Sequence, residues 1–171
     1  MIHETTGDIL MTRAKAIAHG VAPDDHFNQG LALALRERWP AMARDFRHYC
    51  FTSHPQPGGV WMWGGPVGLR IVNLMTQSAP DHHRGHPGPA SLENVNHALR
   101  ALRDLIVAEG LPSVALPRLA TGVGGLEWDD VLPRIHRYLG ELDIPVYVYS
   151  KYVPGEIGLE SELDRKAAAV A

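Results

Sequence analysis

The sequence predicts an α/β domain in which helices cover both faces of a mixed sheet. Short apolar runs of strand type alternate along the chain with longer stretches of helical periodicity, and this alternation is typical of α/β folds. The run at 145–150, PVYVYS, is almost continuously apolar, as expected for a strand that is buried on both faces. A chain of 171 residues suffices for one domain with a sizeable core, and we expect no second domain.

The first half of the chain contains four predicted strands and two predicted helices. The strands are expected at residues 2–6, 16–19, 60–63 and 69–74. The segment 20–30 is rich in turn-forming residues and is expected to be a loop. A helical pattern begins at Leu31, is interrupted at Pro40 and resumes over 41–49.

The second half begins with a polar, proline-rich loop at 76–89. Ser91 has the form of a helix N-cap, and an apolar stripe with helical spacing follows and ends near Gly110. The stripe consists of Leu92, Val95, Leu99, Leu102 and Ile106. The last segment, 154–171, is expected to be a tail outside the core, either a loosely held helix or disordered.

The stretch 113–128 is the one around which the other elements are organised. Its apolar run at 114–116 is of strand type and is closed by Pro117. A turn with three glycines follows at 120–125, and Leu126 is expected to open an amphipathic helix with acidic residues in its first turn. A strand, a glycine-rich loop and a helix N-terminus together can bind an anion such as phosphate. The loop is not a P-loop, because no Lys-Ser/Thr pair follows the glycines.

The composition excludes several classes of function. The formal net charge is −3, so we expect no strong intrinsic affinity for nucleic acid. Cys50 is the only cysteine, which excludes an internal disulfide and a cysteine zinc site. The sequence has no apolar run of transmembrane length and no signal peptide. We therefore expect a cytoplasmic protein without a membrane partner.

Three separated segments resemble the macrodomain family. The likeness is to the branch of terminal ADP-ribose protein glycohydrolases and of bacterial antitoxins that remove ADP-ribose from DNA. The segments are TGDIL at 6–10, the loop and helix start at 17–32, and LPRLATGVGGLEW at 116–128. The resemblance implies a three-layer macrodomain over residues 1–153, with a mixed, mostly parallel central sheet of about six strands.

The resemblance also implies a pocket for ADP-ribose at the C-terminal ends of the strands. Asp8 would accept a hydrogen bond from the adenine amino group, and the backbone N–H of Ile9 would contact the ligand. Two loops would hold the diphosphate between them, and a strand end would lie beneath the distal ribose. The residues expected to bind the ligand are Asp8, Ile9, His19, Phe27, Asn28, Gln29, Gly30, Thr76, Gln77, Thr121, Gly122, Val123, Gly124 and Gly125.

Two positions depart from the pattern of the branch. Its hydrolases use a lysine just after the strand that corresponds to 69–76, where this chain has Gln77. Some also use an aspartate in the glycine-rich loop, where this chain has Gly124. A glutamine side chain neither forms a Schiff base nor carries a titratable proton. The lysine-based mechanism of the branch is therefore not available.

A route that activates water needs a carboxylate or an imidazole near the distal ribose. The candidates are Asp25, His26, His83 and His86. Each has a simpler alternative, because 24–26 could be a solvated turn and 82–86 a solvated loop. The histidines of 82–86 could also belong to a loop that closes over the ribose, whereas their irregular spacing argues against a metal site. His19 could equally be a core histidine satisfied by the backbone.

The sequence leaves two functions open. The first is hydrolysis of an ADP-ribosyl linkage in protein or nucleic acid, or of an ADP-ribose derivative. The second is non-catalytic recognition of ADP-ribose, which the glutamine in place of the lysine favours. A module that binds RNA or a phosphoprotein is disfavoured by the net charge of −3. The expected partner is ADP-ribose or an ADP-ribosylated macromolecule, with no cofactor.

Overall fold

The chain forms one six-stranded sheet with the strand order β1-β6-β5-β2-β4-β3. The structure is a computed structural model and describes residues 1–82 and 85–170. The strands are β1 (Ile2–Gly7), β2 (Ala16–Val21), β3 (Val60–Gly64), β4 (Arg70–Met75), β5 (Val114–Leu116) and β6 (Val146–Tyr152). Neighbouring strands run parallel, except that β3 is antiparallel to β4. The predicted mixed, mostly parallel sheet is confirmed.

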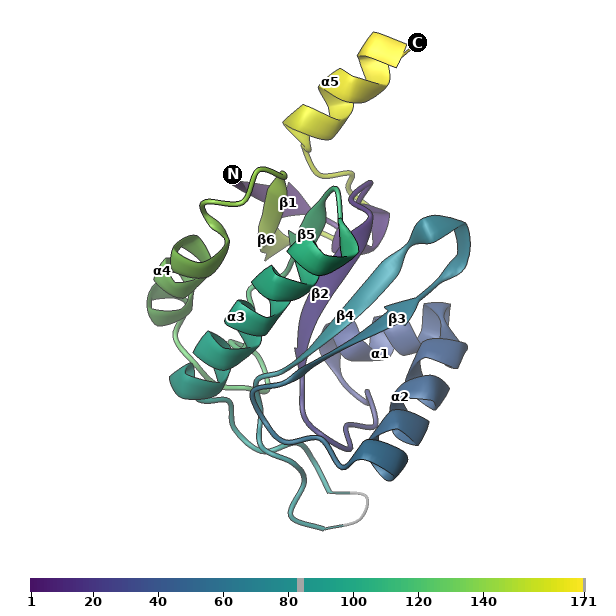
Figure 1. The fold of residues 1–171 in the computed structure, drawn as a ribbon, viewed down its shortest axis with the longest axis vertical. Coiled ribbons are helices and arrows are strands. Elements are labelled where there is room, and N and C mark those ends of the chain that lie inside the picture. Colours follow the sequence, from purple (N-terminus) through teal and green to yellow (C-terminus); the bar gives the residue numbers. More distant parts are fainter. Residues whose placement is uncertain (83–84, 171) are drawn as a thin grey trace.

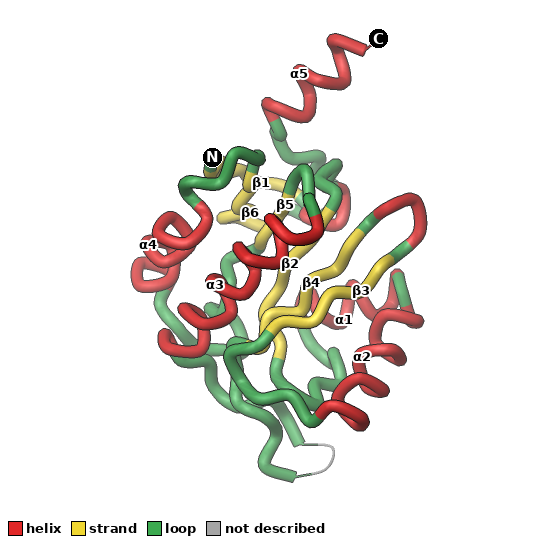
Figure 2. The backbone as a smooth tube through the Cα atoms, in the orientation of Figure 1, coloured by secondary structure: helices red, strands yellow, loops and turns green. Residues whose placement is uncertain are grey.

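Helices form a layer on each side of this sheet (Figure 1, Figure 2). They are α1 (Gly30–Arg38), α2 (Pro40–Ser53), α3 (Leu92–Glu109), α4 (Trp128–Leu139) and α5 (Ser161–Val170), with 3-10 turns η1 (Ile9–Met11) and η2 (Pro66–Gly68). The pair α3 and α4 covers one face, and α1 and α2 cover the other (Figure 1). No helix in the described part of the chain is long and apolar enough to cross a lipid bilayer.

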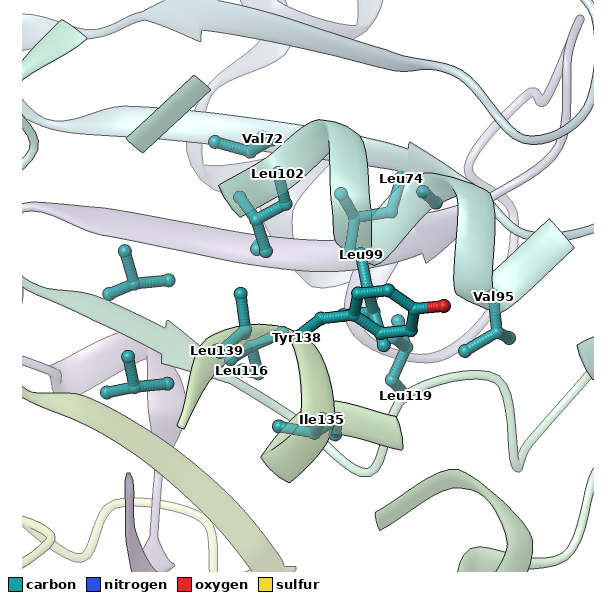
Figure 3. Packing of buried hydrophobic residues seen from close by; sticks show 14 of the residues in the cluster. Val72, Leu74, Val95, Leu99, Leu102, Leu116, Leu119, Ile135, Tyr138 and Leu139 are labelled. Carbon is teal, nitrogen blue, oxygen red and sulfur yellow. The ribbon is translucent and has the colours of Figure 1, made fainter. Parts of the chain in front are cut away.

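Alternation along the strands separates the two halves of the core. Because successive side chains of a strand point to opposite faces, Val146 and Val148 pack with α3 and α4, whereas Tyr147 and Tyr149 pack on the other side. Figure 3 shows the α3–α4 side, where leucines and valines from strands and helices interdigitate around Leu99. Both faces of the central strands are therefore buried, as the apolar run of β6 predicts.

Local sequence signals explain where the helices begin and end. Pro40 occupies the first turn of α2 and separates it from α1, since proline fits a helix start but breaks a helix interior. The hydroxyl of Ser91 accepts a hydrogen bond from the backbone N–H of Asn94 at 3.0 Å and caps α3. Gly110 ends α3 with a φ of 62°. These boundaries agree with the prediction.

One helix begins later than predicted. Helix α4 starts at Trp128 rather than at Leu126, because Glu127 is extended (φ −79°, ψ 136°) and serves as the N-cap residue. The backbone N–H of Leu126 instead donates to the carbonyl of Ala120 at 3.0 Å and closes the glycine-rich loop.

The segment after β6 makes more contacts than a loosely held tail would. The backbone carbonyl of Glu156 accepts a hydrogen bond from the N–H of Asp8 at 2.7 Å, and Glu160 is fully buried. Beyond these contacts α5 projects away from the sheet (Figure 1), and none of its side chains is buried. The domain boundary at residue 153 stays a prediction, but Gly158 and Glu160 are buried against the body.

Candidate functional site

A cavity of about 520 Å³ lies at the edge of the sheet where the parallel strands end. Its wall is formed by segments that follow β1, β2, β4 and β5, together with residues of β6. Ligands of open α/β sheets bind at this edge, in the crevice beside the carboxyl ends of the strands. The position and the size of the cavity both suit a small-molecule site.

Most of the residues that the sequence assigned to the ligand line this cavity. They are Ile9, His19, Asn28, Gln29, Gly30, Gln77, Thr121, Gly122, Val123 and Gly124, together with the catalytic candidates Asp25, His26 and His86. The wall does not include Asp8, Phe27, Thr76 or Gly125. His83 lies outside the described residues. The structure thus brings the two predicted loops together, while the ligand contact of each residue stays a prediction.

Phe27 and Thr76 lie behind the wall rather than in it. Phe27 is buried and stacks on Phe46 with ring centroids 5.1 Å apart. Thr76 is buried next to Gly20, where an added Cβ would lie 2.9 Å from the Thr76 hydroxyl. Glycine at position 20 therefore lets the end of β2 pass close to the end of β4, and both residues support the cavity from beneath.

The carboxylate of Asp8 is bound to the backbone of its own surroundings. One oxygen accepts a hydrogen bond from the N–H of Leu10 at 3.0 Å, and the other accepts one from the N–H of Gly155 at 2.9 Å. Asp8 is buried and caps η1, so it fixes the neighbouring Ile9, which lines the cavity. Its observed contacts are structural, and a contact with adenine stays a prediction.

Asp25 is held in a fixed position in the loop after β2. Its carboxylate accepts hydrogen bonds from the N–H of Ala22 at 3.0 Å and the N–H of Phe27 at 2.8 Å. Burial raises the pKa of Asp25, and these two hydrogen bonds and the nearby His26 lower it by less. A carboxylate with a raised pKa is a better proton acceptor, so Asp25 can act as a base or position one.

The loop that contains Asn28 and Gln29 is held by side-chain hydrogen bonds to two other segments. The guanidinium of Arg36 in α1 donates to the carbonyl of His26 at 2.9 Å and to the Asn28 side chain at 2.7 Å. The Gln29 side chain lies 3.4 Å from Nδ1 of His86, in the loop after β4. The two loops thus meet over the cavity.

Among residues 1–82 and 85–170, no three His, Cys, Asp or Glu side chains are placed to hold a metal ion.

The glycine-rich loop closes on itself and leaves N–H groups unused. Gly125 has a φ of 77° and donates its N–H to the carbonyl of Gly122 at 3.1 Å, and Ala120 also has a positive φ, 63°. In the part of the chain that the structure describes, the backbone N–H groups of residues 122–124 have no backbone acceptor. Successive free N–H groups of this kind form a concave site for an anion.

His19 is a neutral buried imidazole at the floor of the cavity. Its Nε2 lies 2.7 Å from Oδ1 of Asn73, whose Nδ2 donates to the carbonyl of Trp61 at 3.3 Å. Because the Asn73 oxygen is an acceptor, Nε2 of His19 carries the proton. Burial lowers the pKa of His19 to about 4, and the hydrogen bond to Asn73 offsets only part of this effect. The partner of His19 is a side chain, not the backbone that the sequence-based alternative proposed.

Gln77 lies in the wall just after β4, at the position where the resemblance implies a lysine in the hydrolases of the branch. It is buried, and its side-chain amide donates to the carbonyl of Gly88 at 3.2 Å. Its own N–H donates to the carbonyl of Val21 at 3.2 Å. Gln77 therefore holds the loop after β4 against the end of β2, and it supplies no titratable group to the cavity.

Three polar wall residues were not predicted from the sequence. Tyr149 and Tyr152 come from β6, which was predicted only as a strand buried on both faces, and Arg118 follows β5. The Arg118 guanidinium lies over the Trp128 ring, 5.4 Å from its centre.

Comparison with known proteins identifies relatives of the chain. The model of the Macro domain family matches residues 26–135. A DNA ADP-ribosyl transferase–DNA ADP-ribosyl glycohydrolase fusion protein of Thermosipho africanus is 40% identical over 155 residues, which cover 84% of this chain and 40% of that protein. A DNA ADP-ribosyl glycohydrolase of Mycobacterium bovis is 28% identical over 170 residues, which cover 93% of this chain and 46% of that protein. The chain thus spans less than half the length of these relatives.

A solved structure has the same fold. It is the Thermosipho africanus DarTG protein in complex with ADP-ribose, with a TM-score of 0.76 and 21% sequence identity. The match covers 91% of this chain and 42% of the other. At this identity the likeness shows a shared fold, which agrees with the sheet order and the two helical layers described above.

Proposed function

Because the chain belongs to the Macro domain family, we propose that its cavity binds ADP-ribose and that the protein hydrolyses an ADP-ribosyl linkage. The observation that carries the proposal is the presence of two sets of unengaged N–H groups in the wall of one cavity. One set is in the glycine-rich loop, at residues 122–124. The other is at the N-terminus of α1, where Gly30, Leu31 and Ala32 line the cavity.

The two sets of donors suit a diphosphate. The first N–H groups of a helix have no partner within the helix, and the helix dipole favours negative charge at that end. In α1 the first hydrogen bond of this series runs from Leu33 to Gln29, at 3.2 Å, which leaves the preceding N–H groups for a ligand. A diphosphate between this helix start and the glycine-rich loop accepts hydrogen bonds from both sides.

The nucleoside would occupy the end of the cavity near β6. Tyr152 is 55% exposed and lines the wall there with Tyr149 and Ile9. An aromatic ring offers a face for stacking a base, and the backbone of Ile9 offers polar contacts. The distal ribose then lies at the other end, near Asp25, His26 and His86.

The chemistry would be water activation rather than attack by an amine. Asp25 or a histidine removes a proton from a water molecule, whose oxygen forms a bond to the anomeric carbon of the distal ribose. The bond from that carbon to the modified group breaks, and the leaving group takes up a proton. Gln77 positions the loop after β4 in this scheme but takes no part in proton transfer.

ADP-ribosylated DNA is the substrate class that we propose first, because both curated relatives described above are named as DNA ADP-ribosyl glycohydrolases. With a net charge of −3, the chain would recognise such DNA through the ADP-ribose group more than through backbone phosphates. The test is incubation with ADP-ribosylated DNA, ADP-ribosylated protein and small ADP-ribose esters, with products identified by mass spectrometry. Release of ADP-ribose from the DNA substrate supports the proposal.

The second candidate function is a non-catalytic reader of ADP-ribose. It is favoured by one observation, the presence of buried Gln77 where the branch has a lysine. The same substrate panel decides between the two functions. A protein that binds ADP-ribose but releases no product from any substrate is a reader, and our assignment of hydrolysis is then wrong.

A further inference from the structure

We infer that Glu160, which does not line the cavity, is a positioning residue for the nucleoside end of the site. The inference rests on the proposed function, since it concerns how ADP-ribose affinity is set. It starts from the segment that follows β6, residues 153–164, here called the clamp segment. This segment was expected to be a loosely held tail, yet its contacts converge on the residues that form one end of the cavity wall.

The carboxylate of Glu160 is the centre of these contacts. It is completely buried and accepts hydrogen bonds from the Thr12 hydroxyl, from the N–H of Arg13 at 2.8 Å and from the Tyr149 hydroxyl at 2.9 Å. The Arg13 guanidinium lies 3.5 Å from it. A buried carboxylate with this many donors is strongly fixed, because removing it leaves the donors without a partner.

Two of these donors, Tyr149 and Thr12, lead to the cavity wall. Tyr149 is itself a wall residue, and its ring lies against the clamp segment, where an added Cβ on Gly158 would be 2.8 Å from it. Thr12 is the residue that ends η1, and η1 contains Ile9, another wall residue. Glu160 thus sets the positions of two wall elements that lie far apart in the sequence.

A second group of contacts holds the clamp segment in place. The N–H of Gly155 donates to Asp8 at 2.9 Å, and the Arg13 guanidinium donates to the carbonyl of Gly158 at 3.1 Å. Beyond Glu160, the N–H of Glu162 donates to the Tyr147 hydroxyl at 2.9 Å. Because α5 follows directly, ligand affinity is coupled to whether the base of α5 stays docked, and this coupling is reciprocal.

The test compares two substitutions in the clamp segment. Glu160→Ala removes the buried carboxylate, whereas Glu156→Ala removes an equal charge from an exposed side chain of the same segment. We expect Glu160→Ala to raise the Kd for ADP-ribose roughly 3- to 30-fold, the range found for residues that modulate a site without touching the ligand. Glu156→Ala should leave the Kd within about twofold of the parent value. Glu160→Gln and Tyr149→Phe provide the same comparison if Glu160→Ala does not fold.

Two further measurements separate positioning from simple destabilisation. With a substrate that the parent hydrolyses, Glu160 variants should raise KM and leave kcat nearly unchanged, because the hydrogen-bond donors to the Glu160 carboxylate are Thr12, Arg13 and Tyr149, none of which is a catalytic candidate. The effects of Glu160→Gln and Tyr149→Phe on affinity should also be less than multiplicative, since one residue acts through the other. Adding ADP-ribose should slow amide hydrogen exchange at Gly155 and Glu162, neither of which lines the cavity.

The outcomes distinguish this inference from the proposed function. A parent protein that does not bind ADP-ribose contradicts the proposed function. A parent that binds, together with folded Glu160 variants of unchanged Kd, contradicts the role of Glu160 alone. The role of Glu160 is also contradicted if the variants contain a smaller fraction of folded protein but keep the Kd and KM of the parent. That result would show that Glu160 is needed only for folding.

Discussion

His19 and Asn73 face each other as register partners on β2 and β4, and Nε2 of His19 lies 2.7 Å from Oδ1 of Asn73. His19 lines the cavity, whereas Asn73 is fully buried outside its wall and holds the imidazole in place. Their hydrogen bond requires a proton on Nε2 but no charge on the ring. The folded protein therefore keeps His19 neutral, which makes its stability depend on pH.

The stability of the protein should fall as the pH decreases from about 6.5 to about 4. The pKa of His19 is about 4 in the folded protein, against 6.5 for an unperturbed histidine. In this window the unfolded chain takes up a proton that the folded chain does not, so acidification favours unfolding. The free energy of unfolding should fall by about 3 kcal/mol over this window, and His19 should cause no such loss above pH 6.5.

Denaturant unfolding of the parent and of His19→Gln at several pH values checks this prediction. The comparison removes the contributions of other titrating groups, such as Asp25, because both proteins contain them. The free-energy difference between the two proteins should change across pH 4–6.5 and be constant above it. A constant difference over the whole range would show that His19 is not buried as a neutral side chain.

Gly124→Ala should destabilise the glycine-rich loop, and Gly122→Ala should not. An added Cβ on Gly124 would lie 2.6 Å from the carbonyl oxygen of Ala120 and 2.9 Å from the Cβ of Ala90, whereas one on Gly122 meets nothing within 4 Å. Overpacking of this kind costs about 1–3 kcal/mol. Thermal unfolding of the two variants measures the difference, and equal melting temperatures would mean that the loop is not packed as described.

Removing the group that activates water should lower turnover by about 10²–10⁴ and leave ADP-ribose affinity nearly unchanged. The variants are Asp25→Asn, His26→Ala, His83→Ala and His86→Ala, with His48→Ala on the exposed surface of α2 as the control. Asparagine at position 25 keeps the shape of the side chain and one acceptor oxygen, so it retains one of the two hydrogen bonds from the N–H groups of Ala22 and Phe27. Full turnover in all four variants would contradict our choice of catalytic residues.

Asp8→Ala should lower both the melting temperature and the affinity for ADP-ribose. The carboxylate holds the N–H groups of Leu10 and Gly155, and losing hydrogen bonds to a charged group costs about 1–3 kcal/mol. Thermal unfolding and calorimetry on the same variant separate its two roles. A weaker affinity at an unchanged melting temperature would mean that Asp8 contacts the ligand and does little for the fold.

Local patterns were sufficient to predict the α/β class, with helices on both faces of a mixed sheet, and the glycine-rich loop. The six-stranded macrodomain sheet and the ligand role of the loop at 27–30 were implied by the family resemblance. Short apolar runs identify the strands, and Pro40, Ser91 and Gly110 mark helix boundaries through their own backbone geometry. The small residues at 120–125 predict a loop that exposes N–H groups, and the cavity contains this loop. These features depend only on neighbours in the sequence.

The clamp segment could not be predicted in this way. Glu160 bonds to Thr12, which is 148 residues away in the sequence, and such a pairing leaves no periodic pattern in either segment. The polar run around Glu160 is typical of an exposed tail, and burial of the carboxylate follows only from the donors that the fold brings to it. The structural role of Asp8 was not predicted for the same reason, because its hydrogen-bond partner Gly155 is also distant in the sequence.

The most direct test of the proposed site is isothermal titration calorimetry of the parent protein with ADP-ribose, with AMP and ribose 5-phosphate as partial ligands. We predict that ADP-ribose binds at a single site and more tightly than either partial ligand, because only ADP-ribose contacts both ends of the cavity and both sets of N–H donors. Binding should be lost or weakened in Gly124→Ala and kept in His48→Ala. No heat and no thermal shift at millimolar ADP-ribose would contradict the claim that this cavity is an ADP-ribose site.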